Sequence, residues 1–412
     1  MVLIEFFDKE PMNNMIGCLS LRPQKVYFVG GDARRIKKQL PKYSEFLSRR
    51  GIDTQFYVKC AAKNNMGAML SVLEKIVEAE QECCFDLTGG GDVALVAVGV
   101  IYERYRDSRD LTLHRYNIST HSVGLFETDD GEIPQLNTSM PSITIEESVS
   151  LHGGAVCMAQ ENGRRCDGWD FNDEFICDVD TLWNISKKSP SSWNSAVGAL
   201  SALEAAKLPK SSNGLIKADV TINKSASQAV SLLEALAEYG LIHEFEKDGT
   251  TVSYRYKNSQ IKKCLSKAGN VLELKTLILA RRLKNSDGSN YYTDSAMQVC
   301  IDWDGNVNQS GDGKRDTENE IDVVFMKNLV PVFVSCKNGS VGDDELYKLN
   351  TVALRFGGSY VKKVLVATHL GKQGEAAKYF RQRAQDMNIC LIDNVHLIKE
   401  ENFEQKLMNI VM

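Results

Sequence analysis

The chain has 412 residues, of which 43% are hydrophobic and 25% charged, and a formal net charge of −5. This composition excludes a disordered chain, and the length allows about two to four domains that each bury a core. The negative charge excludes a generally basic nucleic-acid coat but allows a local basic cleft.

The sequence has no signal for a membrane or for export. No apolar run approaches the about 18 residues of a membrane-spanning helix, and the N-terminus lacks the basic start of a signal peptide. The 11 cysteines include no CxxC pair, which is typical of scattered reduced thiols. We therefore expect a cytoplasmic protein with no membrane partner.

Short apolar segments alternate with amphipathic helical patterns over the first 118 residues. Strands are predicted at 2–7, 25–31, 55–61, 83–92 and 111–118, and helices at 13–21, 33–50, 67–80 and 93–107. This alternation predicts an α/β domain with a Rossmann-like parallel sheet covered on both faces. The dinucleotide motif GxGxxG does not follow the first strand.

Ligands of such sheets bind where the strand order reverses, which in the Rossmann order lies between the first and fourth strands. Glycines let backbone N–H groups approach an anion, and a helix N-terminus adds positive charge. The candidate ligand-binding residues in the loops there are Lys9, Asn13, Asn14, Gly30, Gly31, Thr88, Gly89, Gly90 and Gly91. The triple glycine is equally compatible with a tight turn between strand and helix.

The middle of the chain loses the strand–helix rhythm. Residues 142–153 have the pattern of one strand, and 173–260 are mostly helical. A helix at 226–242 followed by a hairpin at 243–258 is the pattern of a winged helix, a DNA-reading module in many proteins. Because this helix is acidic, a connector or dimerisation platform is favoured over a DNA reader.

The last 145 residues predict an α/β sandwich. The pattern is a helix at 269–283, strands at 297–303, 319–326 and 331–338, a helix at 344–358, a strand at 362–368, a helix at 375–387 and a strand at 389–393. If two of the strands form a hairpin across the turn 327–330, Asp322 lies opposite Ser335 and Glu320 opposite Lys337. Side chains two residues apart share a face, so all four would point into one site.

A carboxylate and an ammonium on one face, with Glu273 on a nearby helix, suit hydrolysis of a phosphodiester. The carboxylates would hold a hard divalent ion, and the lysine would stabilise developing negative charge. The other interpretation is an ordinary cross-strand ion pair between Asp322 and Lys337 on a solvated face.

These residues resemble the PD-(D/E)xK nuclease superfamily, whose pattern is a helix glutamate, a strand aspartate and an acid-x-lysine on the next strand. Glu273, Asp322 and Ser335-Cys336-Lys337 match it. The hairpin NEIDVVFMKNLVPVFVSCKNG, the segment DELYKL and the N-terminal loops are similar to nucleases fused to a CRISPR-associated Rossmann-fold (CARF) sensor. The family consists of the ancillary nucleases of Type III CRISPR systems, which are homodimers activated by cyclic tetra-adenylate.

The resemblance implies a metal site that departs from the family at one position. Ser335 stands where the pattern has an acid. A metal would use Asp322 and the backbone carbonyl of Cys336, with Glu273, Glu320 or Glu345 replacing the missing charge. Manganese would then be preferred to magnesium, because it tolerates poorer geometry.

The resemblance also implies three domains: a CARF-like sensor at 1–150, a small helical, winged-helix-like connector at 151–267 and a restriction-endonuclease-like domain at 268–412. The expected function is cleavage of DNA and/or RNA in antiviral defence by a metal-dependent homodimer that cyclic tetra-adenylate activates. The alternative is a cyclic-oligoadenylate-responsive transcriptional regulator with an inactive nuclease-like domain, in which Asp322 and Lys337 would be freely replaceable.

Overall fold

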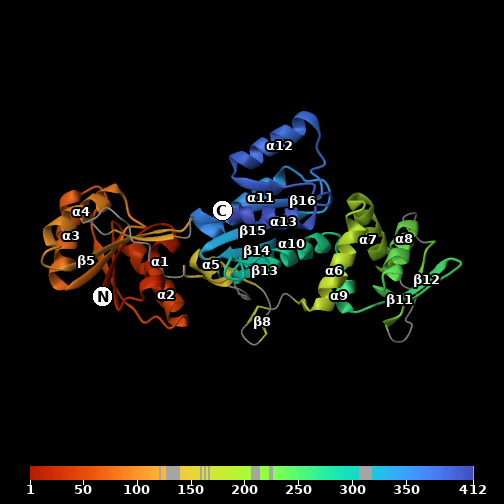
Figure 1. Ribbon diagram of the computed structural model, residues 1–412, viewed down its shortest axis with the longest axis horizontal. Coiled ribbons are helices and arrows are strands. Elements are labelled where there is room, and N and C mark those ends of the chain that lie inside the picture. Colours follow the sequence, from red (N-terminus) through yellow and green to blue (C-terminus); the bar gives the residue numbers. More distant parts are fainter. Residues whose placement is uncertain are drawn as a thin grey trace, which may run out of the picture.

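The computed structural model describes residues 1–119, 122–126, 140–157, 160–161, 164–165, 168–205, 214–221, 226–305 and 318–411. They form an N-terminal α/β domain, a C-terminal α/β domain and a smaller unit, residues 168–264, that we term the winged unit (Figure 1). The winged unit lies between the two domains in the sequence. In space the C-terminal domain lies in the middle, with the other two at its opposite ends.

The N-terminal domain is built on a sheet with the strand order β3-β2-β1-β4-β5-β6. Its first five strands are parallel and β6 is antiparallel to β5. The elements are β1 (Val2–Phe6), α1 (Pro11–Leu21), β2 (Lys25–Gly30), α2 (Ala33–Arg49), β3 (Gln55–Cys60), α3 (Met66–Ala79), β4 (Glu82–Asp86), α4 (Asp92–Tyr105), β5 (Asp110–Asn117) and β6 (Ser122–Phe126). The order confirms the predicted Rossmann-like arrangement, with its reversal between β1 and β4.

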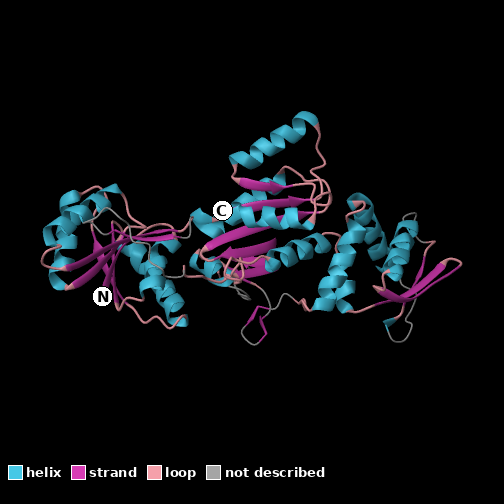
Figure 2. Ribbon diagram, in the orientation of Figure 1, coloured by secondary structure: helices cyan, strands magenta, loops and turns pink. Residues whose placement is uncertain are grey.

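The C-terminal domain is a mixed sheet with the order β17-β16-β15-β14-β13-β7, covered by helices (Figure 2). Its elements are α10 (Asn270–Arg282), β13 (Asp294–Asp302), β14 (Glu318–Lys327), β15 (Val330–Lys337), α11 (Asp344–Gly357), a 3₁₀ turn η2 (Gly358–Tyr360), β16 (Lys362–Ala367), α12 (Gly374–Asp386), β17 (Ile389–Ile392), α13 (Glu400–Met408) and η3 (Asn409–Val411). The expected sequence of helices and strands is confirmed.

The winged unit has the predicted helix followed by a two-stranded hairpin. It contains α6 (Asp173–Ser186), α7 (Pro190–Ala205), β10 (Ile216–Asp219), α8 (Ala226–Glu238), β11 (Ile242–Asp248), β12 (Thr251–Tyr256) and α9 (Ser259–Cys264), with the strand order β10-β12-β11. Helix α8 contains no lysine or arginine, and Glu234 and Glu238 lie on its exposed face.

Residues 142–153 form a helix rather than the expected strand. In α5 (Ile145–Leu151), the Thr144 hydroxyl accepts a hydrogen bond from the Glu147 N–H, and the Glu147 carboxylate accepts one from the Thr144 N–H. This capping box stabilises the first turn and outweighs the alternating pattern. The chain continues into β7 (Ala155–Val156), the edge strand of the C-terminal sheet, and a small hairpin of β8 (Gln160–Glu161) and β9 (Arg164–Arg165).

Helix α5 joins the two α/β domains. It packs against α2 on one side and against α11, β13 and β14 on the other, so one apolar core continues from the N-terminal domain into the C-terminal domain. Arg50 Nε donates to Glu147 at 2.8 Å, and the Ile145 N–H donates to Asp294 at 2.9 Å. Within the described residues, no helix is long and apolar enough to cross a membrane.

Candidate active site and ligand-binding loops

The hairpin of β14 and β15 has the expected register, with Met326 opposite Pro331. Just beyond the paired residues, Asp322 Oδ2 accepts hydrogen bonds from Ser335 Oγ at 3.2 Å and from the Cys336 N–H at 2.6 Å. The predicted proximity of Asp322 and Ser335 is therefore confirmed. These two donors orient the carboxylate at the open end of the hairpin.

The expected pairing of Glu320 with Lys337 is wrong. The ladder between β14 and β15 ends at Val323, and Glu320 pairs instead with Cys300 of β13. Its half-exposed carboxylate lies 3.8 Å from the Lys267 ammonium. The reason is that β14 leaves β15 at this point while it stays paired with β13.

Lys337 lies between two carboxylates. Its Nζ is 3.5 Å from Asp322 Oδ2 and 3.1 Å from Glu345 Oε2, at the start of α11. Burial by itself lowers the pKa of Lys337, but the two carboxylates outweigh it and hold that pKa above its usual value. Lys337 is thus a permanent cation rather than a base at neutral pH.

Glu273 is the buried member of the site, with a side chain in the first turn of α10. Burial, and then the nearby Asp322 carboxylate, raise the pKa of Glu273 to about 8. The predicted helix glutamate therefore shares an electrostatic environment with Asp322. Without a cation, the site favours a proton on Glu273.

Gln298 belongs to the site and was not predicted. Its amide donates to Glu273 Oε2 at 3.3 Å and to Asn270 Oδ1 at 3.1 Å. Its φ of 53° is left-handed backbone within β13, which a non-glycine residue adopts only under constraint from its surroundings. The one signal in the sequence is an amide inside the otherwise apolar segment MQVCI.

The residues present fit a hard divalent cation. Asp322 and Glu273 influence each other electrostatically, and two carboxylates are ligands of the kind that hold Mg²⁺ or Mn²⁺ together with waters. Among the described residues, no group of three or more acidic, cysteine or histidine ligand atoms within 4.8 Å of one another includes Asp322 or Glu273. The Glu345 carboxylate is engaged by Lys337, and a metal-binding role for the Cys336 carbonyl stays a prediction.

The strand ends of the N-terminal sheet surround a cavity of 340 Å³. Gly30, Gly90 and Gly91 line it together with Lys63 and Asn64. Gly31, which does not line the cavity, lies close to Lys63. A cavity thus opens where the strand order reverses, as expected.

Other predicted residues shape these loops through contacts within the chain. A Cβ atom on Gly89 would lie 2.7 Å from the Phe6 carbonyl oxygen, so this position needs glycine for packing. The Thr88 hydroxyl accepts a hydrogen bond from the Tyr116 N–H at 2.8 Å. The buried Asn14 amide donates to the Asp8 carbonyl at 2.9 Å. These contacts hold the loops in place.

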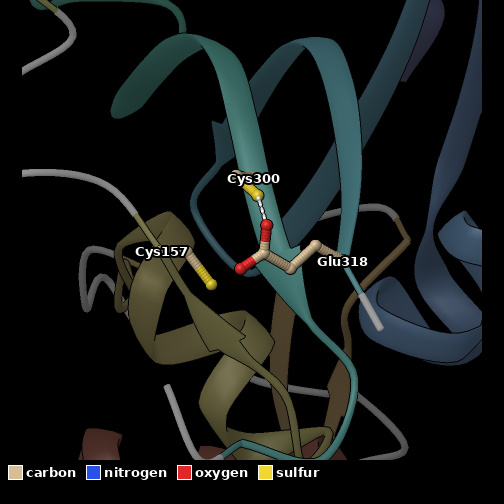
Figure 3. Close-up of side chains that lie close together, drawn as sticks. All are labelled: Cys157, Cys300 and Glu318. Carbon is tan, nitrogen blue, oxygen red and sulfur yellow. Dashed lines mark hydrogen bonds between the residues drawn. The ribbon is translucent and has the colours of Figure 1, made fainter. Parts of the chain in front are cut away.

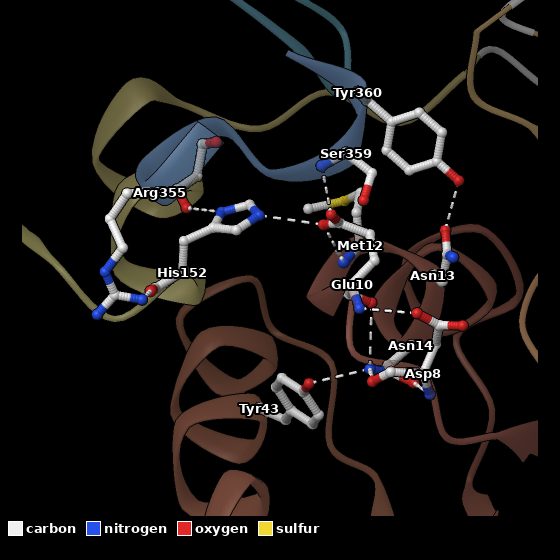
Figure 4. A network of polar contacts seen from close by, with 11 residues as sticks. Asp8, Glu10, Met12, Asn13, Asn14, Tyr43, His152, Arg355, Ser359 and Tyr360 are labelled. Atoms are coloured by element: carbon white, nitrogen blue, oxygen red, sulfur yellow. Dashed lines mark hydrogen bonds and ion pairs between the residues drawn. The ribbon is translucent and has the colours of Figure 1, made fainter. Parts of the chain in front are cut away.

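A second cavity, of 560 Å³, lies where the N-terminal domain meets the C-terminal domain. Its basic lining residues are Lys9, Arg35, Lys38, Lys42 and Arg355. The predicted residue Asn13 also faces this junction, where its amide oxygen accepts a hydrogen bond from the Tyr360 hydroxyl at 2.6 Å (Figure 4).

Glu10 is the centre of the junction and was not predicted. Its carboxylate accepts hydrogen bonds from His152 Nε2 at 3.0 Å, the Ser359 N–H at 2.7 Å and the Met12 N–H at 3.3 Å (Figure 4). Burial alone raises the pKa of Glu10, but these donors outweigh it and hold that pKa below its usual value. Gly358 has a φ of 66°, and a Cβ atom there would overlap Glu10 and His152.

Residues 270–408 match the family described as "Card1-like, endonuclease domain". No curated protein matches the chain. The fold is similar to that of protein VC1899 from Vibrio cholerae, with a TM-score of 0.71 and 16% identity over 100% of this chain and 97% of that one. It is also similar to Can2 from Sulfobacillus thermosulfidooxidans, solved in complex with cyclic tetra-adenylate, with a TM-score of 0.62 and 15% identity over 100% and 97% of the two chains.

The family match confirms the expected endonuclease-like domain at the C-terminal end of the chain. The matched endonuclease family falls on the domain that carries Glu273, Asp322 and Lys337. The fold of the entire chain, from the Rossmann-like sheet to the C-terminal domain, is shared with Can2.

The raised pKa of Glu273 predicts a pH-dependent loss of stability. The folded protein holds this proton more tightly than the unfolded chain, whose value is near 4.5, so the stabilisation is fully present below about pH 4.5 and is lost as the pH rises toward 8. In EDTA, the melting temperature of the Glu273→Gln variant should therefore be a few degrees above that of wild type at pH 8. At pH 5 the two melting temperatures should be nearly equal.

Thermal denaturation of both proteins at several pH values measures this difference. Glu234→Gln is the control, because this glutamate lies on the exposed face of α8. Parallel pH profiles for wild type and Glu273→Gln would contradict the raised pKa.

Proposed function

Because residues 270–408 form a Card1-like endonuclease domain, we propose that this protein is a metal-dependent nuclease that cyclic tetra-adenylate activates for antiviral defence. The substrate is DNA, RNA or both. The observation that carries the catalytic part is the cluster of Asp322, Lys337 and Glu273 at the open end of the hairpin.

The side chains have distinct roles in this proposal. Lys337 keeps its charge between Asp322 and Glu345 and stabilises negative charge on the scissile phosphate. Ser335 and the Cys336 N–H both bond Asp322 Oδ2, so we assign metal binding to Oδ1. When bound by Asp322 and Glu273, a divalent cation supplies charge neutralisation and lowers the pKa of a bound water. Gln298 positions the Glu273 carboxylate.

Removal of either charged group should abolish most cleavage. We expect Asp322→Ala and Lys337→Ala each to lower kcat by about 10²–10³-fold, the scale for loss of one transition-state contact. Cleavage of labelled DNA and RNA at saturating metal and activator measures the effect. Lys378→Ala, at an exposed lysine of α12, is the control. Near wild-type turnover in Lys337→Ala would refute its catalytic role and favour the regulator alternative.

Manganese should support faster cleavage than magnesium. Ser335 supplies a hydroxyl where the family pattern has an acid, and Mg²⁺ demands near-ideal octahedral geometry. We expect no cleavage in EDTA and a higher maximal rate with Mn²⁺ than with Mg²⁺ in full titrations. Ser335→Asp should narrow the difference between the two metals. Equal rates in wild type would contradict the geometric argument.

The N-terminal domain is the proposed sensor. Can2 was solved with cyclic tetra-adenylate, and in this chain a cavity of 340 Å³ opens where the strand order of the N-terminal sheet reverses. Its glycine loop begins α4, so backbone N–H groups and the Lys63 ammonium are available to phosphates. A ring with repeated phosphates matches two such sites related by a two-fold axis, which supports a homodimer.

The surface beside this cavity suits dimer formation. Helix α4 follows Gly91 directly and exposes Leu95 and Val96, the latter by 56%. We propose that two copies of α4 meet here. Val96→Glu should convert a dimer into a monomer in sedimentation of the full chain, whereas Leu397→Glu, at a leucine 73% exposed on the other α/β domain, should not. A wild-type monomer with and without ligand would contradict the dimer.

Helix α11 connects the sensor to the active site. Its first turn carries Glu345, which pairs with Lys337, and its C-terminal end leads directly into Gly358 and Ser359, which contact Glu10. With 14 residues the helix is about 21 Å long. We propose that ligand binding moves the loop of Glu10 and thereby shifts α11, which alters the position of Glu345 beside Lys337.

Breaking the Glu10 junction should uncouple binding from activation. We expect Glu10→Gln and Gly358→Ala to bind cyclic tetra-adenylate with nearly unchanged affinity by calorimetry but to lose most of its stimulation of cleavage. The control is Glu45→Gln, at an exposed glutamate of α2. Full activation in both variants would exclude this route. Loss of ligand binding would instead place Glu10 in the ligand site.

The regulator alternative receives no support from the winged unit. Phosphate contacts need lysine or arginine, and the helix that would enter the groove, α8, has neither. We therefore assign the winged unit a structural role beside the nuclease domain, against which α6 packs.

A further inference from the structure

Two thiols and a carboxylate converge at one edge of the C-terminal sheet. Cys157, Cys300 and Glu318 each offer a ligand atom, and these atoms all lie within 4.8 Å of one another (Figure 3). Cys300 Sγ donates to Glu318 Oε2 at 3.5 Å. Among the described residues, this is the one group of three or more acidic, cysteine or histidine side chains with such spacing.

The sheet itself brings these residues together. Val156 pairs with Ile301, so Cys157 follows opposite Cys300, and the Cys157 N–H donates to the Cys300 carbonyl at 2.8 Å. On the other side, Glu318 lies diagonally across from Cys300, because β13 pairs Cys300 with Glu320. Side chains two residues apart share a face. Three separate stretches of chain therefore present ligands on one face.

The donor set indicates the class of metal. Thiolates are soft ligands that select Zn²⁺ over Mg²⁺ or Mn²⁺, and Zn²⁺ also accepts carboxylate oxygen. We propose that Cys157, Cys300 and Glu318 bind one Zn²⁺ ion, with a fourth position open to water. Without a cation, the Cys300 thiol donates its proton in a hydrogen bond to Glu318. A divalent ion compensates the two thiolates.

This site is separate from the catalytic one. Glu318 and Asp322 lie on the same face of β14, four residues and thus about 13 Å apart. By binding Cys157, Cys300 and Glu318, the zinc ion would cross-link the end of β7, an edge strand of two residues, to β13 and β14. Because β7 directly follows α5 and His152, the ion would stabilise the segment on which the sensor docks.

Metal binding to the full chain tests the proposal directly. Reduced protein stripped of metal is titrated with Zn²⁺, and with Co²⁺ as a spectroscopic probe of thiolate ligation. We expect one ion per chain, a sulfur-to-cobalt charge-transfer band and a higher melting temperature with Zn²⁺. Cys300→Ser should abolish the charge-transfer band. Loss of an outer-sphere partner typically lowers metal affinity by about 10–100-fold, and Glu318→Gln, which removes a direct ligand, should lower the Zn²⁺ affinity by more than this. Cys177→Ser, at an exposed cysteine of α6, is the control.

Several outcomes would overturn the proposal. These are absence of binding by reduced wild type, full binding by the Cys157→Ser, Cys300→Ser double variant, or a Cys157–Cys300 disulfide in the isolated protein with no metal uptake after reduction. Asp322→Ala should keep zinc while losing cleavage. The zinc site and the proposed nuclease function can therefore fail independently.

Discussion

The arrangement of the two α/β domains depends on one buried carboxylate. Glu10 caps α1 and at the same time accepts hydrogen bonds from His152 and from the Ser359 N–H. A buried carboxylate is costly unless its oxygens are hydrogen-bonded, so these donors cannot move apart without a penalty. Gly358 allows this approach because any side chain there would overlap the carboxylate. The junction is therefore specific in geometry, and it lies beside the loop that shapes the ligand-binding edge of the sheet.

The candidate active site, at the other end of α11, also depends on how buried charges are compensated. Lys337 is placed between Asp322 and Glu345, so its charge is compensated, whereas the buried Glu273 accepts a hydrogen bond from the Gln298 amide and has its pKa raised by burial and by Asp322. Burial of Glu273 and the negative charge of Asp322 favour either a proton on Glu273 or a divalent cation. The two thiols and Glu318 form a second cluster, with softer ligands, on the same sheet, and this cluster is the proposed zinc site.

Local patterns were sufficient to predict much of the fold. Alternation of strands and helices indicated the Rossmann-like sheet, and counting back from the turn of the hairpin placed Asp322 beside Ser335. The same count failed at Glu320, because β14 separates from β15 there and only the tertiary structure shows where a ladder ends. The segment at 142–153 was predicted as a strand although it contains the capping signature of Thr144 and Glu147. Its alternation of apolar residues arises from burial on two sides, between α2 and the C-terminal sheet.

The sequence by itself determined most of the elements, the hairpin that places Asp322 beside Ser335 and the glycine loops, because these follow from periodicity, turn chemistry and residue type over short distances. The tertiary structure decided what lies next to what. It placed the winged unit at one end of the C-terminal domain and the N-terminal domain at the other. It also brought Glu10 to Ser359, Gln298 to Glu273 and Cys157 to Cys300. Such contacts join residues up to hundreds of positions apart, and they depend on the packing of entire surfaces, which no local pattern encodes.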